Sequence, residues 1–308
     1  MGAHLSSHGY DYGNILTDSL KVNWRVEDII GDDKSLDFTR PLLPEALAGV
    51  SDLLCLNAAE KLKLNHIRGN SYLHLFGFVE EFILPFVMDH TRKLVHGDAL
   101  ELRAYLTFAE EEAKHMHLFK RFSAEFAKGF GTPCGVIGPA NEVAAAVLKH
   151  SALGVGLVIL HLEWLTLRHY MESVRTDEKL DPQFCSLLRH HWMEESQHAK
   201  LDTLLVEKLA QDASPEEIDK GIDDFLAIGG MLDGGMAAQA ALDLEALQLA
   251  CNRTFSEAEK AAILDVQKRS YRVVFLGMGM THPNFVRTLT EISPRGAARV
   301  AEVAKVFS

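Results

Sequence analysis

The sequence has few cysteines and no excess of positive charge. Both features exclude certain kinds of site and partner. Its four cysteines, among 308 residues, lie far apart and form no Cys-x-x-Cys pair. This argues against a disulfide framework and a structural zinc site, and it suits a reducing compartment. The net charge is -12 without a basic stripe, so we do not expect nucleic acid as a partner.

Long apolar segments of the kind that target or cross a membrane are also missing. Residues 1–10 are polar and lack the apolar region of a signal peptide. The most apolar run, residues 152–160, is shorter than the roughly 20 residues that span a bilayer, and His161 and Glu163 follow it. We therefore expect a cytoplasmic protein that does not associate with a membrane.

The hydrophobic pattern predicts helices throughout, because no segment alternates with the period of two that is typical of strands. With 47% hydrophobic residues, the chain can bury a large core. The long helices are expected at about 58–92, 98–128, 141–174 and 181–210. Short connections between them predict an all-α protein built on an up-down four-helix bundle of two hairpins.

We divide the chain into three parts that form one domain overall. Residues 1–57 are an irregular N-terminal segment with a short helix after Pro44, residues 58–211 form the bundle, and residues 212–308 form C-terminal helices packed on it. The C-terminal helices are expected at about 215–228, 234–251 and 257–279 and after Pro294. The Ala- and Gly-rich helix 234–251 is a candidate homodimer contact.

Two Glu-x-x-His motifs lie within the expected bundle: Glu112 with His115, and Glu195 with His198. Positions i and i+3 share a helix face, so each pair can bind one metal ion. The helix before each motif carries a glutamate at an apolar position, Glu80 and Glu163, and in both cases 32 residues separate it from the motif glutamate. This is the ligand pattern of ferritin-like di-metal bundles.

Charge and ligand type indicate which metals such a site would hold. Four carboxylates balance two divalent cations, and a mixed imidazole and carboxylate set suits iron or manganese better than zinc or calcium. We predict two Fe ions, with a Mn/Fe pair as the alternative. His191 lies four residues before Glu195 on the same face and adds a third imidazole.

Two glutamates beside the motif carboxylates are expected to orient the imidazoles. Glu111 and Glu194 immediately precede the motif glutamates. Each is placed to accept the Nδ1–H of the imidazole on the opposite helix, Glu111 for His198 and Glu194 for His115. Such a bond fixes the tautomer and raises ligand basicity.

Several alternatives remain open at this stage. Glu81 replaces Glu80 if Pro85 kinks the first helix. For Glu163 the alternative to a metal is a buried ion pair with Arg168 or His161. For His191 the alternative is a position beside the ligands or in the core. The motifs together also fit solvated Glu/His pairs on a metal-free structural bundle.

The combination His191-x-x-x-Glu195-x-x-His198, with Glu112-x-x-His115 and the single glutamates Glu80 and Glu163, resembles the di-iron N-oxygenases that oxidise p-aminobenzoate. The likeness covers about residues 60–210 in ligand spacing alone, and Glu111 and Glu194 stand where that family tends to have Asp. It implies a monooxygenase that uses O2, a small organic substrate and electrons from a ferredoxin or reductase. Another di-iron hydroxylase or desaturase, or an iron-handling ferroxidase, is the alternative. No catalytic residue beyond the metal ligands is assigned.

Overall fold

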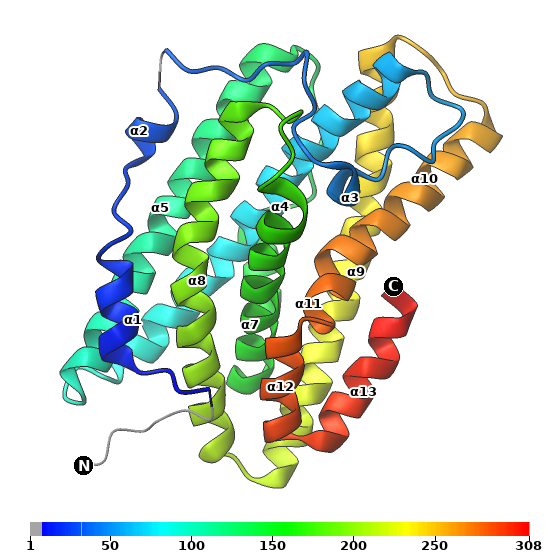
Figure 1. Cartoon of the computed structure of the whole chain (residues 1–308). Coiled ribbons are helices and arrows are strands. Elements are labelled where there is room, and N and C mark those ends of the chain that lie inside the picture. Colours follow the sequence, from blue (N-terminus) through cyan, green and yellow to red (C-terminus); the bar gives the residue numbers. More distant parts are fainter. Residues whose placement is uncertain (1–7, 32, 308) are drawn as a thin grey trace.

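The computed structural model describes residues 8–31 and 33–307, and all regular structure in these ranges is helical. Its centre holds the four long helices α4 (Ala58–Arg92), α5 (Ala99–Phe130), α7 (Ala152–His169) and α8 (Pro182–Gln211). Helix α4 packs on α5 and α7 packs on α8, which gives the two expected hairpins (Figure 1). The all-α bundle is thus confirmed. The polar stretch 1–10 lies largely outside the described residues.

Local capping signals explain why three of these helices begin where the sequence predicts. Asn57 and Glu60 form a reciprocal capping box at α4, with bonds of 3.0 and 2.9 Å. Asp98 caps α5, and Asp181 caps α8 ahead of Pro182 at the first helical position. Helix α4 continues through Pro85 as a single helix.

The expected helix 141–174 was wrong, because the structure breaks it. It consists of α6 (Ala140–Val147), α7 and a π-helical turn η1 (Tyr170–Val174). Ser151 caps α7 by accepting from the backbone N–H of Gly154, and its own N–H donates to Asp224 at 2.9 Å. A carboxylate 73 residues away therefore fixes the turn between α6 and α7.

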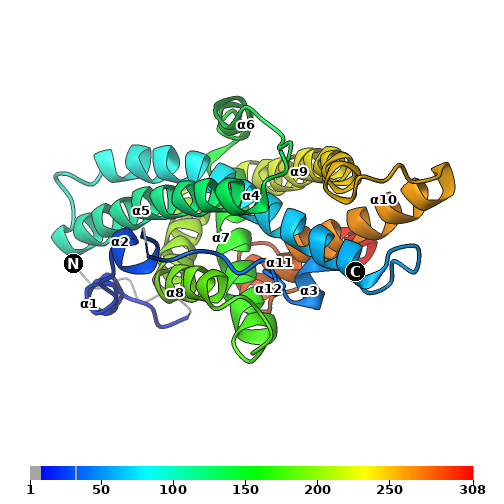
Figure 2. The ribbon, with the colours of Figure 1, turned by 90° about the horizontal axis from the view of Figure 1, so that it is seen from above.

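The separate helices expected at 215–228 and 234–251 were also wrong, since they form one helix, α9 (Pro215–Cys251). It runs along α7 and α4, on the side of the bundle where α6 also lies (Figure 2). The contacts that bury Ile228 and Met236 on these neighbours outweigh the cost of the glycines between them. Gly230 and Gly234 lie on the open side of α9, where an added Cβ meets no atom within 4 Å.

The remaining C-terminal elements continue the layer that α9 begins. They are α10 (Glu257–Arg272), the π-helical turn η2 (Val273–Gly277), α11 (Met278–Met280), α12 (Pro283–Ile292), α13 (Pro294–Ala304) and the 3-10 turn η3 (Lys305–Phe307). Helix α12 was not predicted. The single helix expected at 257–279 is α10, η2 and part of α11.

Buried histidines of α7 fasten this layer to the bundle. His161 Nε2 donates to the Phe275 carbonyl at 2.9 Å, and His169 Nε2 donates to the Val274 carbonyl at 3.0 Å. Burial lowers the pKa of His161 to about 4, so its ring is neutral at neutral pH. Gly279 lies against the same ring, and a Cβ there would come within 2.4 Å of it.

The described N-terminal segment contains α1 (Tyr12–Ser19), α2 (Val26–Ile29) and α3 (Glu45–Ala48). Its first part, with α1 and α2, runs along the outside of α5 and α8, and the chain then crosses to α3 beside α4 and α10 (Figure 1). The predicted short helix is α3, with Pro44 as the residue before it rather than its first residue. Helices α1 and α2 were missed; both contact α5 and α8 and cover the face where those helices meet.

Within the described residues, two helices, α4 and α9, are long and apolar enough to cross a membrane by length and composition alone. In α4, 56% of the most apolar stretch is buried within the protein, against 33% in α9. A core helix passes the same test as a membrane span, and α4 is such a helix. Its apolar surface is used inside the bundle.

Candidate metal centre

The structure brings all seven predicted ligands into the core of the bundle. They come from four helices, and each is at most 3% exposed. The residues are Glu80 on α4, Glu112 and His115 on α5, Glu163 on α7, and His191, Glu195 and His198 on α8.

The ligand atoms form two overlapping groups. Glu112, His115, Glu195 and His198 can each place one donor atom within 4.8 Å of the others, and the same holds for Glu80, His115 and His191.

Glu195 lies between the imidazoles. Its Oε1 is 3.0 Å from His191 Nε2, 3.2 Å from His115 Nδ1 and 3.5 Å from His198 Nδ1. This places one carboxylate where it can touch both halves of a two-ion site.

The structure also separates Glu80 from Glu81. Glu80 Oε1 lies 3.4 Å from His191 Nε2, whereas Glu81 is half-buried and lines a shallow surface cavity with Lys120. Helix α4 therefore directs Glu80, and not its neighbour, into the cluster.

The alternative ion pairs of Glu163 are not formed. Arg168 donates to Glu172 at 3.0 Å, and the Nε2 of His161 is occupied by a backbone carbonyl. Glu163 instead faces Glu195, inside the cluster.

Each of the seven residues has at least one buried donor atom that makes no hydrogen bond. These atoms are Glu80 Oε2, both oxygens of Glu112, His115 Nδ1, Glu163 Oε2, His191 Nε2, Glu195 Oε1 and His198 Nδ1. Several lie within ion-pair distance, yet they lack hydrogen-bond geometry. Buried polar atoms in folded proteins are nearly always paired. Atoms that converge on common points without bonding to one another have the arrangement that a metal requires.

The carboxyl groups respond to one another in two pairs. Burial and the charge of Glu112 raise the pKa of Glu80, and burial and the charge of Glu195 raise the pKa of Glu163. Burial opposes ionisation of Glu195, but the nearby His191 and a hydrogen bond from Glu163 outweigh it and lower its pKa. The pKa values shift in this way because carboxylates that lie close together have no cation between them to balance their charge.

The outer nitrogen of each motif imidazole is held by the glutamate that the sequence assigned to it. Glu111 accepts from His198 at 2.9 Å, and Glu194 accepts from His115 at 2.8 Å. The predicted atom was wrong, since the bonded nitrogen is Nε2, which leaves Nδ1 facing the cluster. The side-chain rotamer decides this, and helical spacing does not specify it.

Three further residues at the centre escaped the sequence analysis. Trp24, from the N-terminal segment, stacks on His115 with ring centroids 6.0 Å apart. Lys114 bonds Glu194 and lies 4.2 Å from the Trp24 ring centroid. Asp202, four residues after His198, is fully buried with both oxygens unpaired. Only Asp202 had a sequence signal, because it continues the ligand face of α8.

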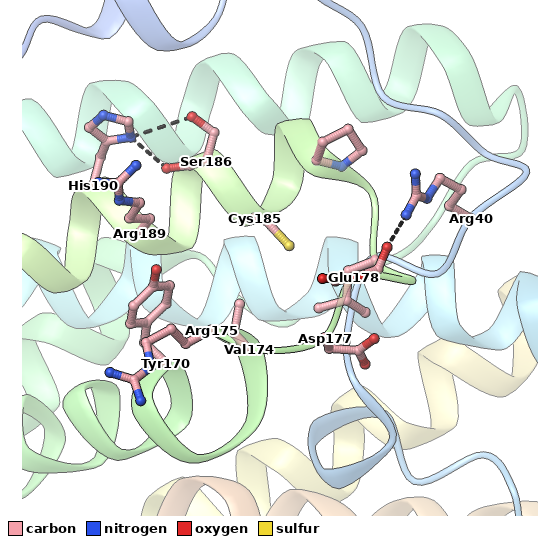
Figure 3. A pocket seen from close by; sticks show the side chains of 12 residues that line it. Arg40, Tyr170, Val174, Arg175, Asp177, Glu178, Cys185, Ser186, Arg189 and His190 are labelled. Atoms are coloured by element: carbon pink, nitrogen blue, oxygen red, sulfur yellow. Dashed lines mark hydrogen bonds between the residues drawn. The ribbon is translucent and has the colours of Figure 1, made fainter.

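Two of the cavities beside the bundle differ in the character of their linings. The larger, about 450 Å³, opens beside the start of α8 and mixes Arg175 and Arg189 with Asp177 and Glu178; Arg40 at its rim bonds the Glu178 backbone (Figure 3). The smaller, about 270 Å³, lies among α4, α6, α7, α9 and η2 and is lined by apolar residues and glycine.

Comparison with known proteins identifies the fold class of the chain. No protein-family model matches the chain, and no curated protein matches it in sequence. Among solved structures, a variant R2-like ligand-binding oxidase with an Fe/Fe cofactor aligns with a TM-score of 0.51 and 13% identity over 86% of this chain and 94% of that one. Another variant of such an oxidase, with a Mn/Fe cofactor, aligns with a TM-score of 0.48 and 14% identity over 89% and 94% of the two chains. The first alignment, together with the helical bundle, shows that this chain has the ferritin-like all-α fold.

Proposed function

We propose that the chain binds two metal ions at this centre, Fe/Fe or Mn/Fe, and uses them with O2 to oxidise a small organic substrate. The observation that carries the proposal is the set of buried, converging donor atoms without hydrogen bonds. The Fe/Fe cofactor of the R2-like oxidase supports the choice of metal, as does the ligand chemistry.

The bound metals would supply the electrons that reduce dioxygen and the oxidising power that acts on the substrate. The protein's part is to hold and shield them. Glu111 and Glu194 fix the rings of His198 and His115 through Nε2, so that Nδ1 of each ring faces the position of the metals. The core around the ligands excludes water.

Within this class, we propose a di-iron monooxygenase that transfers oxygen to an amine nitrogen. The resemblance to N-oxygenases implies a third histidine on this helix, and His191 supports the proposal because its Nε2 faces both Glu80 and Glu195. C-hydroxylation or desaturation is the runner-up, with the same metal centre. We propose a cytoplasmic setting, consistent with four free cysteines, and a ferredoxin or reductase as electron donor.

The test is the metal content of the protein after anaerobic loading with Fe(II), measured by mass spectrometry. We expect about two irons per chain, and a loss of at least one in Glu112→Ala and in Glu195→Ala. Glu110→Ala is the matched control, because this exposed neighbour lies outside the cluster. Fewer than one iron per chain in the unmodified protein would refute the proposal, and oxygen consumption by the loaded protein checks the reaction.

A further inference from the structure

The smaller cavity defines the chemistry of a ligand for this protein. Its walls come from five helical elements and the loop before α6, and all thirteen lining residues are apolar or glycine, among them Phe82, Met236 and Phe275. Its volume of about 270 Å³ lies just below the usual range for small-molecule sites, about 300–1,000 Å³. It can therefore hold a small apolar molecule, such as a substituted benzene ring.

The position of this cavity relates it to the metal centre. Val79 and Leu162 line it, and each directly precedes a predicted ligand, Glu80 and Glu163. Successive side chains on a helix point about 100° apart, so the same turns of α4 and α7 face the cavity with one residue and the centre with the next. A molecule in the cavity lies against the two helix segments that carry these glutamates.

The absence of charge in the lining decides between substrate classes. Among the lining residues there is no arginine, lysine, histidine or hydroxyl group. An ionised carboxylate buried there would lose its hydration without gaining a partner, which is costly. The ring of an arylamine or another uncharged molecule has no charge whose hydration is lost, and it gains apolar contact.

We propose that this cavity binds the substrate, and that the substrate is an uncharged apolar molecule rather than an aromatic acid such as p-aminobenzoate. The role of the cavity as a substrate site rests on the proposed oxidase function, but binding of a molecule in the cavity does not require metal. The cavity and the metal centre can therefore be tested separately.

Gly235 offers a way to fill the cavity without disturbing the helix. It lines the cavity, and the nearest atom to an added Cβ is the Ile137 methyl at 3.4 Å. A leucine there projects into the cavity. Gly234→Leu is the matched control, because it makes the same change one residue away on the open side of α9.

The experiment measures binding of toluene and benzoate to the full chain by calorimetric titration, with and without Fe(II) under anaerobic conditions. The two probes differ only in a methyl or carboxylate group. We expect toluene to bind at least about a hundredfold more tightly than benzoate, and Gly235→Leu to weaken toluene at least about tenfold while Gly234→Leu does not. Val143→Phe, from the α6 wall, provides a second filled variant should Gly235→Leu not fold.

Equal binding of the two probes, no binding of toluene, or unchanged binding in both filled variants would overturn the proposal. Toluene binding that the filled variants abolish, in a protein that takes up no iron, would leave the cavity standing and remove the oxidase. Iron uptake and oxygen consumption without toluene binding would support the oxidase function and refute the cavity as the substrate site.

Discussion

Replacing Glu80 by leucine should change stability in opposite directions with and without metal. Glu80 is 2% exposed, its Oε2 has no hydrogen bond, and burial raises its pKa. In the metal-free protein, leucine removes an unsatisfied buried polar group, which costs about 1–3 kcal/mol. Leucine is of similar size, so we expect the free energy of unfolding to rise by about 1–2 kcal/mol.

With metal present, Glu80→Leu should instead lower the free energy of unfolding relative to the unmodified protein. A ligand at 100 times its Kd stabilises the folded state by about 2.7 kcal/mol per site. Removing Glu80 weakens at least one site, so the variant should lose most of that increment at the same Fe(II) concentration. The assay is urea unfolding under anaerobic conditions, followed by circular dichroism, with and without Fe(II).

The adjacent Glu81→Leu provides the control, since Glu81 is half-buried at the surface and should shift stability by no more than about 0.5 kcal/mol in either condition. Two results would refute the reasoning. One is a Glu80→Leu protein that Fe(II) stabilises as much as the unmodified chain. The other is a metal effect that disappears in Glu81→Leu instead.

Three more predictions follow from contacts described above. Glu194→Gln should lower Fe(II) affinity about 10–100-fold, measured by chelator competition, with unchanged affinity contradicting its orienting role. His161 has a folded pKa of about 4 against 6.5, so the unfolded state binds more protons between these values and stability falls as pH drops. In urea unfolding of the metal-free protein, His161→Leu should reduce by about 2 kcal/mol the free energy of unfolding that is lost between pH 7 and pH 5. The control His96→Asn, at an exposed position, should leave this loss unchanged. Gly279→Ala should destabilise by about 1–3 kcal/mol in the same assay and Gly230→Ala should not; equal effects would refute the close contact.

Sequence reasoning located helices accurately where the signals are local. The start of α4 matches the expected residue 58 because Asn57 and Glu60 cap this end through neighbouring atoms. The break before α7 depends on Asp224, which is far along the chain, so periodicity in 141–174 could not reveal it. The sequence analysis expected separate helices at 215–228 and 234–251, whereas tertiary packing holds both in the single helix α9 despite the glycines between them.

The candidate site shows the same division. Helical spacing placed the seven ligand candidates on common faces. The structure brings six of them into two overlapping groups, and the seventh, Glu163, faces Glu195. Spacing could not show that Trp24 would stack on His115, because an irregular segment carries it. It also could not show which imidazole nitrogen faces inward, since this depends on side-chain torsions.

The two hairpins form a pseudo-symmetric pair, and one substitution breaks the equivalence. The position on α5 that corresponds to His191, four residues before the motif glutamate, is Phe108, whose ring packs 4.2 Å from that of His198. One half of the centre therefore has two imidazoles, His115 and His191, and the other has one imidazole beside a phenyl ring. Two ions bound here would occupy chemically distinct positions, so the protein could load them in a fixed order and discriminate between two different metals.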